Sequence, residues 1–304
     1  MVPLEISNAM LGGSTSIAEP DTGAGESAWT ASASYSLGDR KTSAGKVYEC
    51  VQAHTGRTEL PAADAAYWLA VGPTNRMAPF DDYNSTKATK ATTLTYVINP
   101  GFCNGLALYE LAGDTYTVTV KDAPGGTVIA SYSGGLVEEA PGFYELLFTT
   151  LTVKTQLSFD SLPLTPTPEI TIKLDASGSN PVAVGTIKVG DWRMLMGDGY
   201  FGGTQYGASA ERKSYTYREY FDDGTYKTVR RPASRDVRCS VLIESAQAMY
   251  ADAVLAEVID TAAPFEACGL PKYGYLNTVG FVSGTIQADT FGTTTLDLTV
   301  KGNI

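Results

Sequence analysis

The sequence predicts a mainly β fold made of several modules, and three observations support this prediction. The chain combines 31 Gly and 18 Tyr with only 18% charged residues, which is typical of short strands, tight turns and half-buried aromatic surfaces. Runs of alternating apolar and polar residues recur between Gly and Pro. A single segment has convincing helical spacing. We therefore expect a small aromatic β module, an antiparallel β-sandwich of the jelly-roll type and a C-terminal β domain with one helix.

Changes in composition divide the 304 residues into four segments, 1–27, 28–72, 73–185 and 186–304. This length is enough for two or three domains that each bury a core. Residues 1–27 are rich in Gly, Ser, Ala and Asp, which is the composition of an extended arm that buries little surface by itself. We expect this arm to be either a disordered tail or a strap ordered by a neighbouring subunit.

Residues 28–72 have the pattern of a compact aromatic β module. Two strands are predicted, over 35–41 and 46–53, with turns at Gly38-Asp39 and Ala44-Gly45. A module of this size buries only a thin core, so large rings must supply most of it. The rings available are Trp29, Tyr35, Tyr48 and Trp68.

Residues 73–185 contain regularly spaced alternating runs with turn residues between them. The predicted strands are 115–120, 127–132, 143–149, 154–159 and 169–174. In the first of these, Tyr116, Val118 and Val120 alternate with threonines, so one face should be buried and the other hydrated. Short strands with turns this regular favour an antiparallel sandwich.

Residues 186–304 predict a sheet with one helix laid on it. The predicted strands are 186–189, 213–221, 225–229, 237–243, 280–287 and 293–301. Asp222-Asp223-Gly224 joins the second of these strands to the third and is a strong hairpin signal. Residues 245–259 repeat apolar side chains at steps of three and four, which predicts a helix that Ser245 can cap.

The charge and hydropathy patterns exclude several classes of function. A formal charge of −11 argues against nucleic-acid binding, because phosphate contacts need clustered Lys and Arg. No run of about 18 apolar residues is present, so we expect no membrane span. Residues 1–10 lack the basic and apolar regions of a signal peptide.

The cysteines and the single histidine do not form a metal-binding pattern. Cys50, Cys103, Cys239 and Cys268 are scattered in apolar or aromatic settings, which favours reduced, mostly buried thiols of a protein made in a cytosol. A zinc site would need His partners, and His54 is the only histidine. We therefore expect neither a metal nor a cofactor.

The sequence contains no recognisable catalytic motif. It has no nucleophile elbow, P-loop, dinucleotide-binding glycine pattern or metalloprotease motif. Paired carboxylates occur at Asp81-Asp82, Glu138-Glu139 and Asp222-Asp223, but adjacent residues on a strand point to opposite faces, whereas glycosidases need two carboxylates facing one cleft. We interpret Asp222-Asp223 as turn chemistry and His54 as a surface or hydrogen-bonding residue. We predict no catalytic residue and no enzymatic activity.

Residues 28–72 resemble the chitin-binding type of carbohydrate-binding module found on bacterial glycosidases. The residues that match the pattern of that family are Ala28-Trp29, Tyr35, Gly38-Asp39, Gly45-Lys46-Val47-Tyr48 and Trp68. The match covers roughly one seventh of the chain.

Residues 71–82 read Val-Gly-Pro-Thr-Asn-Arg-Met-Ala-Pro-Phe-Asp-Asp. This looks like the segment that links such a module to a β-sandwich in many bacteriophage tail proteins. The final third is also similar to phage tail architecture, because a Tyr/Asp-rich hairpin, an Arg-rich strand, a helix and a closing strand follow in that order. The closing strand carries Leu296, Leu298, Val300 and Gly302. The whole chain thus resembles tail-tip or baseplate proteins of bacteriophages.

This resemblance implies a structural subunit of a phage tail tip or baseplate, made in the host cytoplasm and located in the virion. It implies other tail proteins as partners, a symmetric homo-oligomer (trimer or hexamer) and host cell-surface glycan as a further contact. Two other classes remain as alternatives. The first is a secreted or virion glycan-binding accessory protein, and the missing signal peptide counts against its secreted form. The second is a glycan-cleaving tail enzyme, which is disfavoured because the sequence shows no acid/base pair.

Glycan binding would require exposed aromatic faces in a line, because pyranose rings stack on flat aromatic surfaces. The candidates are Trp29, Tyr48, Tyr67 and Trp68. Residues 49–56 depart from active chitin-binding modules, which usually place adjacent exposed aromatics there. The four rings are therefore either a glycan platform or the core of the module.

Arg230, Arg231, Arg235 and Arg238 form the one local reversal of the acidic charge. We expect them at a subunit interface, because Arg binds the carboxylates of a neighbouring acidic surface bidentately. Solvated charges on a sheet face and a nucleic-acid patch are the alternatives.

Overall fold

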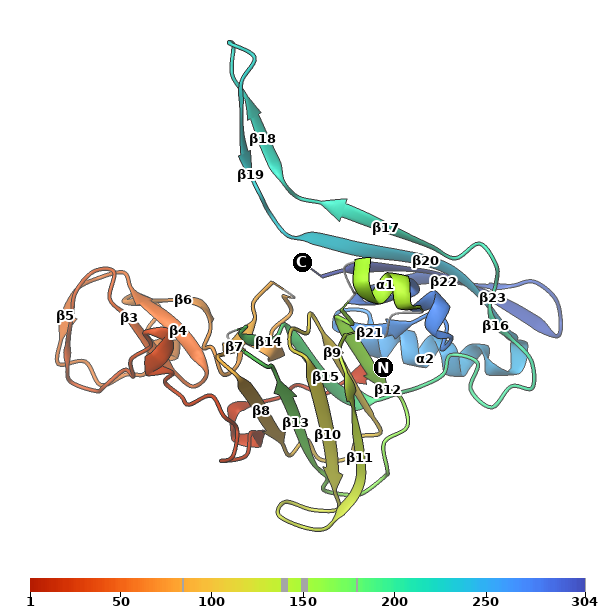
Figure 1. Ribbon diagram of the computed structural model, residues 1–304, viewed down its shortest axis with the longest axis horizontal. Helices are drawn as coiled ribbons and strands as arrows, with labels where there is room; N and C mark the ends of the chain where they lie inside the picture. Colours follow the sequence, from red (N-terminus) through yellow and green to blue (C-terminus); the bar gives the residue numbers. More distant parts are fainter. Residues whose placement is uncertain (84, 138–141, 149–152, 179, 304) are drawn as a thin grey trace. The chain divides into compact units, whose positions relative to one another are not determined.

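The computed structural model describes residues 1–83, 85–137, 142–148, 153–178 and 180–303. Antiparallel sheets dominate it, which confirms the predicted mainly β fold. The chain divides into two units, which we call the N-terminal unit (Glu5–Ile187) and the C-terminal unit (Met1–Leu4 with Lys188–Ile304). Figure 1 labels their elements. None of the helices in the part of the chain that the structure describes is long and apolar enough to cross a membrane.

The N-terminal unit is built from short strands with brief helical turns between them. Its 3₁₀ turns are η1 (Asn8–Met10), η2 (Thr22–Ala24), η3 (Pro61–Ala63) and η4 (Ala78–Phe80), and its helix is α1 (Phe143–Phe148). Its strands are β2 (Ser34–Tyr35), β3 (Arg40–Ser43), β4 (Lys46–Cys50), β5 (His54–Thr55), β6 (Trp68–Pro73), β7 (Ala88–Lys90), β8 (Thr93–Ile98), β9 (Gly105–Tyr109), β10 (Thr115–Lys121), β11 (Val128–Gly135), β12 (Gln156–Phe159), β13 (Glu169–Asp175) and β14 (Val182–Val184).

The largest sheet of this unit has the strand order β11-β10-β13-β8, and all its pairs are antiparallel. Val118 and Val120 of β10 are buried, while Thr117 and Thr119 are partly exposed, as the alternation predicts. Tyr116, at the end of the same face, is only partly buried. Strands β9 and β12 form a second antiparallel pair, and every residue of β9 is buried. The apolar side chains of both sheets supply the core.

Residues 5–27 are ordered against their own unit, which differs from both states that we expected for the arm. Ile6, Leu11 and Ile17 are buried. The Gly12 and Ser16 N–H groups donate to the Val97 and Thr95 carbonyls, both at 2.8 Å. The arm therefore covers the outer edge of β8. The Gly, Ser and Thr residues of the arm form hydrogen bonds with the edge of β8, and composition alone does not predict these bonds.

The aromatic module contains a three-stranded sheet, β3-β4-β6, and the short pair β2–β5. Tyr35, Tyr48, Cys50 and Trp68 form its buried cluster, with Trp29, Ala33 and Tyr67 packed partly buried against it. Large rings therefore supply most of the core, as predicted. The hairpin β3–β4 turns at Ala44-Gly45, where both residues have positive φ, 49° and 80°.

Two predicted strands of this unit are wrong. The 35–41 strand is split, because the Gly38-Asp39 turn lies inside it and separates β2 from β3. Residues 143–148 of the predicted 143–149 strand form the helix α1, in which the Tyr144 and Phe148 rings lie 5.0 Å apart. A short aromatic run fits either periodicity, and residues four apart meet only on a helix. Residue 149 lies outside the described residues.

The C-terminal unit is one large antiparallel sheet with a long helix. Strand β15 (Thr186–Asp191) enters it from the N-terminal unit and pairs with β1 (Val2–Pro3). The other strands are β16 (Gly203–Thr204), β17 (Ser209–Ser214), β18 (Tyr217–Tyr220), β19 (Tyr226–Val229), β20 (Ala233–Glu244), β21 (Ala262–Glu266), β22 (Asn277–Ala288) and β23 (Thr293–Gly302). Its helical elements are η5 (Ser245–Gln247), α2 (Ala248–Val258) and η6 (Pro271–Leu276).

Strands β20, β23 and β22 form the centre of this sheet, and α2 contributes to the same core. The core side chains include Val237, Ile243, Leu296 and Val300, with Ala251 from the helix. Backbones approach closely between β22 and β23. A Cβ atom placed on Gly280 would lie 2.0 Å from the Lys301 carbonyl oxygen, so this position requires glycine.

Two details of the C-terminal prediction are corrected by the structure. The predicted 213–221 strand is two strands, because the chain leaves the large sheet after β17 and continues in a separate hairpin, β18–β19. The predicted helix is present as η5 and α2, but Ser245 does not cap it. The Ser245 hydroxyl instead donates to the Thr290 carbonyl, so it is used by the turn between β22 and β23.

We expect Gly280→Ala to destabilise the C-terminal unit by more than about 3 kcal/mol, because the new methyl group overlaps the backbone of β23. Gly292→Ala is the matched control, since no described atom beyond its two chain neighbours lies within 4 Å of the position of its Cβ. Urea unfolding should show the control within about 0.5 kcal/mol of the wild type. Equal stability of the two variants would contradict the close approach.

The Lys121–Glu169 pair across β10 and β13 should make stability depend on acid pH. The 2.5 Å bond from Lys121 Nζ lowers the pKa of Glu169 below its ordinary value of 4.5, burial opposes this effect, and the Gly125 N–H adds to the lowering. The stabilisation is thus present above pH 4.5 and is lost as pH falls through the lowered pKa. We expect Glu169→Gln to cost about 1 kcal/mol at pH 7 and less near pH 3.

Unfolding curves of Glu169→Gln at the two pH values test this, with Glu211→Gln on the exposed strand β17 as the control. The control should change stability little at either pH. A loss for Glu169→Gln that is as large near pH 3 as at pH 7 would contradict the assigned direction of the pKa shift.

Candidate functional site

Two of the four candidate glycan-binding rings are core residues of the aromatic module. Tyr48 is 6% exposed and Trp68 is 3% exposed. The Tyr35 ring meets the Trp68 ring edge to face, with centroids 5.0 Å apart. Neither Tyr48 nor Trp68 presents a face on which a sugar ring could stack. A glycan platform in this module would therefore rest on Trp29 and Tyr67.

Trp29 and Tyr67 are both partly buried, and Tyr67 already has a partner on its ring. The Arg57 guanidinium carbon lies 4.0 Å from the Tyr67 ring centroid. Arg57 is held there by a bidentate pair with the buried Asp64, at 2.6 and 3.1 Å. This contact covers one aromatic face and orders the loop between β5 and β6.

His54 is a packing and hydrogen-bonding residue of the same cluster. Its ring lies 5.1 Å from the Tyr67 ring and 5.3 Å from the Trp68 ring. Its Nδ1 atom lies 3.0 Å from the Gln52 carbonyl oxygen. The carbonyl contact fits the hydrogen-bonding role expected for His54, and the Tyr67 and Trp68 rings also hold the imidazole against the module core.

Of the paired carboxylates noted in the sequence, Asp81 and Asp223 make local turn contacts. Asp223 accepts hydrogen bonds from the Thr225 N–H and hydroxyl, at 2.8 and 2.6 Å, and these bonds lower its pKa. Asp81 accepts in the same manner from the Tyr83 N–H. Glu138-Glu139 lies outside the described residues. Within the described ranges, no cluster of three His, Cys, Asp or Glu side chains is arranged to hold a metal ion.

The four thiols are free, and Cys50, Cys103 and Cys239 are buried. Burial raises the pKa of Cys103 and of Cys239 to about 11. Burial also raises the pKa of Cys50. These thiols are therefore protonated at neutral pH, which is the state of inert core cysteines.

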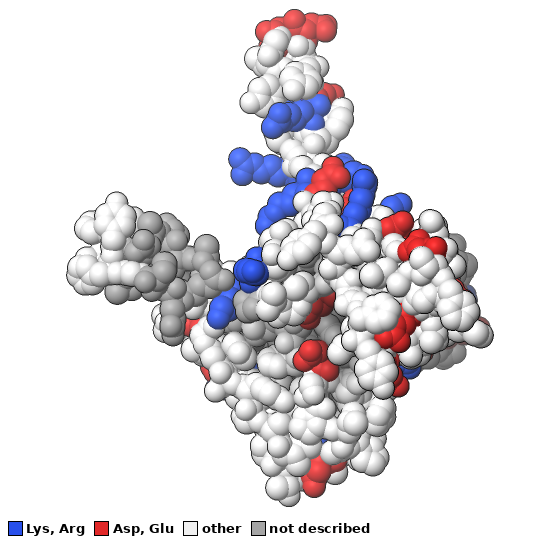
Figure 2. Space-filling model, turned by 90° about the vertical axis from the view of Figure 1, so that its right-hand side faces the viewer, with Lys and Arg blue, Asp and Glu red and all other residues white. Residues whose placement is uncertain are grey.

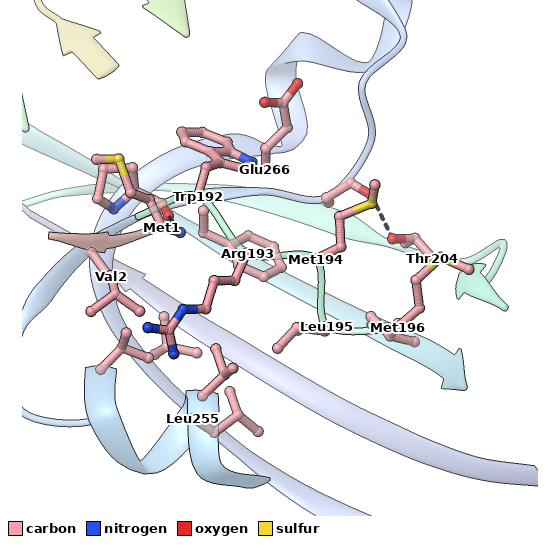
Figure 3. Close-up of a pocket in the computed structure, with 18 of the residues that line it drawn as sticks. Met1, Val2, Trp192, Arg193, Met194, Leu195, Met196, Thr204, Leu255 and Glu266 are labelled. Atoms are coloured by element: carbon pink, nitrogen blue, oxygen red, sulfur yellow. Dashed lines mark hydrogen bonds between the residues drawn. The ribbon is translucent and has the colours of Figure 1, made fainter. Parts of the chain in front are cut away.

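A cavity of about 350 Å³ lies inside the C-terminal unit, between the 192–196 segment, α2 and β21. Figure 3 shows Trp192, Met194, Leu195 and Leu255 among the apolar side chains that line it. The one Arg of its lining, Arg193, is paired with Asp191 and Glu257 at 2.6 and 2.8 Å. The Thr204 hydroxyl donates to the Ala267 carbonyl. The charged and polar groups of the lining are thus already used within the chain.

The four candidate interface arginines do not form one patch. Arg230 and Arg231 are exposed in the segment between β19 and β20. Arg235 and Arg238 lie on β20 itself, where Arg235 is partly buried and its Nη1 donates to the Asn277 carbonyl. Arg230 and Arg231 therefore lie at the base of the hairpin, whereas Arg235 and Arg238 lie on the large sheet.

The hairpin β18–β19 is the most exposed regular element of the C-terminal unit. Its two strands pair only with each other among the described strands, and Figure 1 shows them extending beyond the ends of β17 and β20. Every residue of both strands is exposed. Tyr217, Tyr220 and Tyr226 keep 53%, 69% and 60% of their surface in solvent.

Both faces of this hairpin carry apolar groups. Tyr217 lies opposite Val229 on one face, and Tyr220 lies opposite Tyr226 on the other, with ring centroids 5.8 Å apart. The Asp222-Asp223-Gly224 turn predicted the hairpin, but the sequence pattern did not predict that every residue of both strands is exposed. The signal that was available is the composition of the two strands, which read Tyr-Arg-Glu-Tyr and Tyr-Lys-Thr-Val and contain one aliphatic residue.

Charge is separated along the hairpin. Arg212, Lys213, Arg230 and Arg231 lie at its base, and Asp222 and Asp223 lie in the turn at its tip. Figure 2 shows this as acidic atoms at the far end of the projection and basic atoms below them. The turn itself is held by Gly224, which has φ 81°, and by the Asp223–Thr225 bonds.

No family model matches the chain, and no curated protein matches it. Among solved structures, the chain is similar to a selenomethionine-labelled mutant of chitosan-binding module 1, derived from a chitosanase/glucanase of Paenibacillus sp. IK-5. The identity is 13%, the TM-score is 0.25, and the alignment covers 37% of this chain and 81% of that chain. A TM-score this low supports neither a shared fold nor a shared ligand.

We expect Trp68→Ala to destabilise the aromatic module by about 3–5 kcal/mol, because it removes the most buried ring of a small core. Tyr67→Ala is the neighbouring control and should cost about 1 kcal/mol, since its ring is partly exposed and mainly supports Arg57. Thermal unfolding and protease cleavage within 28–72 measure both changes. Similar losses for the two variants would contradict the assigned burial.

Substitution of the two partly buried rings, Trp29 and Tyr67, addresses glycan binding directly. If Trp29 and Tyr67 form a platform, Trp29→Ala and Tyr67→Ala should reduce retention on chitin while the fold stays intact. If both rings are structural, wild-type retention is at background and only stability changes.

Proposed function

We propose that this chain is a structural subunit of a bacteriophage tail tip or baseplate, which assembles with other tail proteins. The observation that carries the proposal is the β18–β19 hairpin. Its aromatic rings are exposed on both faces, and among the described residues no third strand pairs with it and no core lies under it. An assembly contact has this form before its partner is present.

The physical cost of such a hairpin favours a docked state. An isolated two-stranded hairpin is only marginally stable in water, and it leaves two strand edges open. A partner that covers its rings would bury apolar surface, at about 25 cal/mol for each Å² removed from water. Tyr and Arg are also the residue types that are enriched where protein interfaces concentrate their binding energy.

The sequence resemblance supports the tail assignment in particular. It lies in the module of residues 28–72, in the 71–82 segment and in the order of elements of the final third. In the structure, the 71–82 segment is tied to the arm: Asn75 Nδ2 donates to Asp21 at 2.6 Å, and the Asn75 N–H donates to Glu26 at 2.7 Å. A firmly anchored segment of this kind suits a subunit that carries mechanical load. Host-surface contact through the aromatic module is a further part of the proposal.

Incorporation into particles tests this function. We expect mass spectrometry to detect the chain in purified particles of the tailed phage that carries its gene. Immunogold labelling should locate it at the distal end of the tail. Changing Tyr217, Tyr220 and Tyr226 to Ser should lower its incorporation at least tenfold, with the melting temperature within about 2 °C of the wild type.

The matched control changes Tyr200, Tyr206 and Phe291 to Ser, because these rings are 99%, 101% and 104% exposed in the same unit. The control should be incorporated normally. Absence of the wild-type chain from particles would exclude the proposed function, and normal incorporation of the hairpin variant would remove the observation that carries it.

A further inference from the structure

The basic and acidic residues of the hairpin lie toward opposite ends, which suits a partner whose acidic and basic ends run the other way. Segment 209–231 holds six basic and four acidic residues, a formal charge of +2 within a chain of −11. Four of the six basic residues, Arg212, Lys213, Arg230 and Arg231, lie at the base together with the acidic Glu211, and Arg212 lies opposite Arg235 of the large sheet. The acidic residues of the turn lie at the opposite end. The hairpin is thus basic at one end and acidic at the other.

Backbone groups on the outer edges of the hairpin also lack partners among the described strands. Strand β18 bonds β19 through one edge, and the outer edge of each strand is unpaired among the described strands. A free edge beside exposed aromatic rings accepts another strand readily, because backbone hydrogen bonds and ring contacts then form together.

We propose that the hairpin pairs with the hairpin of a second copy of this chain, with the two hairpins antiparallel about a twofold axis. The inference rests on the proposed function, since it names the partner of an assembly subunit. In this arrangement the acidic tip of each copy, with Asp222 and Asp223, lies against the basic base of the other, with Arg230 and Arg231.

The antiparallel direction follows from the charges. A parallel arrangement would place acidic tip against acidic tip and basic base against basic base, which costs free energy at both ends. A twofold axis makes one surface self-complementary, so both ends are satisfied by the same contact. The Tyr217–Val229 and Tyr220–Tyr226 pairs supply apolar surface between the two charged ends. Such a contact is compatible with a hexamer built from three pairs.

Charge reversal at each end provides the test. The base variant carries Arg230→Glu and Arg231→Glu, which lie in an exposed segment. The tip variant carries Glu219→Lys and Asp222→Lys and leaves Asp223 in place, because Asp223 holds the turn through Thr225. The control carries Lys46→Glu and Lys154→Glu, two exposed residues outside the hairpin with the same charge change as the base variant.

Sedimentation equilibrium of the full-length chain is the measurement. We expect the wild type and the control to dimerise alike, and each reversed variant to dimerise at least tenfold more weakly. An equimolar mixture of base and tip variants should regain wild-type affinity as a heterodimer, because both ends are then complementary again. A merely destabilised hairpin would not recover in the mixture.

The proposal is overturned if the wild type stays monomeric up to about 100 μM, or if the mixed variants fail to recover. The proposed function would survive either result if the hairpin variant still fails to enter particles. The partner of the hairpin would then be another tail protein. Absence of the wild-type chain from particles would instead remove the function and leave only a self-association.

Discussion

Pairing of backbone N–H and C=O groups at strand edges is the constraint on which the rest of this structure depends. In the N-terminal unit, residues 5–27 cover the outer edge of β8, with bonds from Gly12 and Ser16 to that strand. In the C-terminal unit, β20 is paired along both edges, by β23 on one side and by β16 and β17 on the other. The hairpin β18–β19 is different, because its outer edges meet no other described strand.

The aromatic residues of the two units show how the same residue types serve opposite purposes. In the module of residues 28–72, Tyr35, Tyr48 and Trp68 are buried because a small sheet has little other apolar material for its core. In the hairpin, Tyr217, Tyr220 and Tyr226 remain exposed because none of the described elements forms a second layer beneath them. Core rings stabilise the monomer, whereas exposed rings on a projecting element become useful only when a partner covers them.

Much of the fold was predictable because the signals are local. The Ala44-Gly45 and Asp222-Asp223-Gly224 turns determine which strands pair, and the buried Val118 and Val120 follow from simple alternation. The ordered arm was not predictable, since its Gly, Ser and Thr residues acquire a role only beside β8. The helix over residues 143–148 was missed because a six-residue aromatic run carries too few turns to distinguish the two periodicities.

The sequence by itself determined the mainly β class, the central turns, the long helix and the residue types of both candidate sites. Only the tertiary structure decided which aromatic rings are buried, and it removed Tyr48 and Trp68 from the candidate glycan surface. It also divided the Arg cluster between the base of the hairpin and β20, and it put acidic and basic residues at opposite ends of one projection. The physical reason is that a side chain's chemistry is local, whereas its exposure depends on distant residues that the sequence order does not reveal.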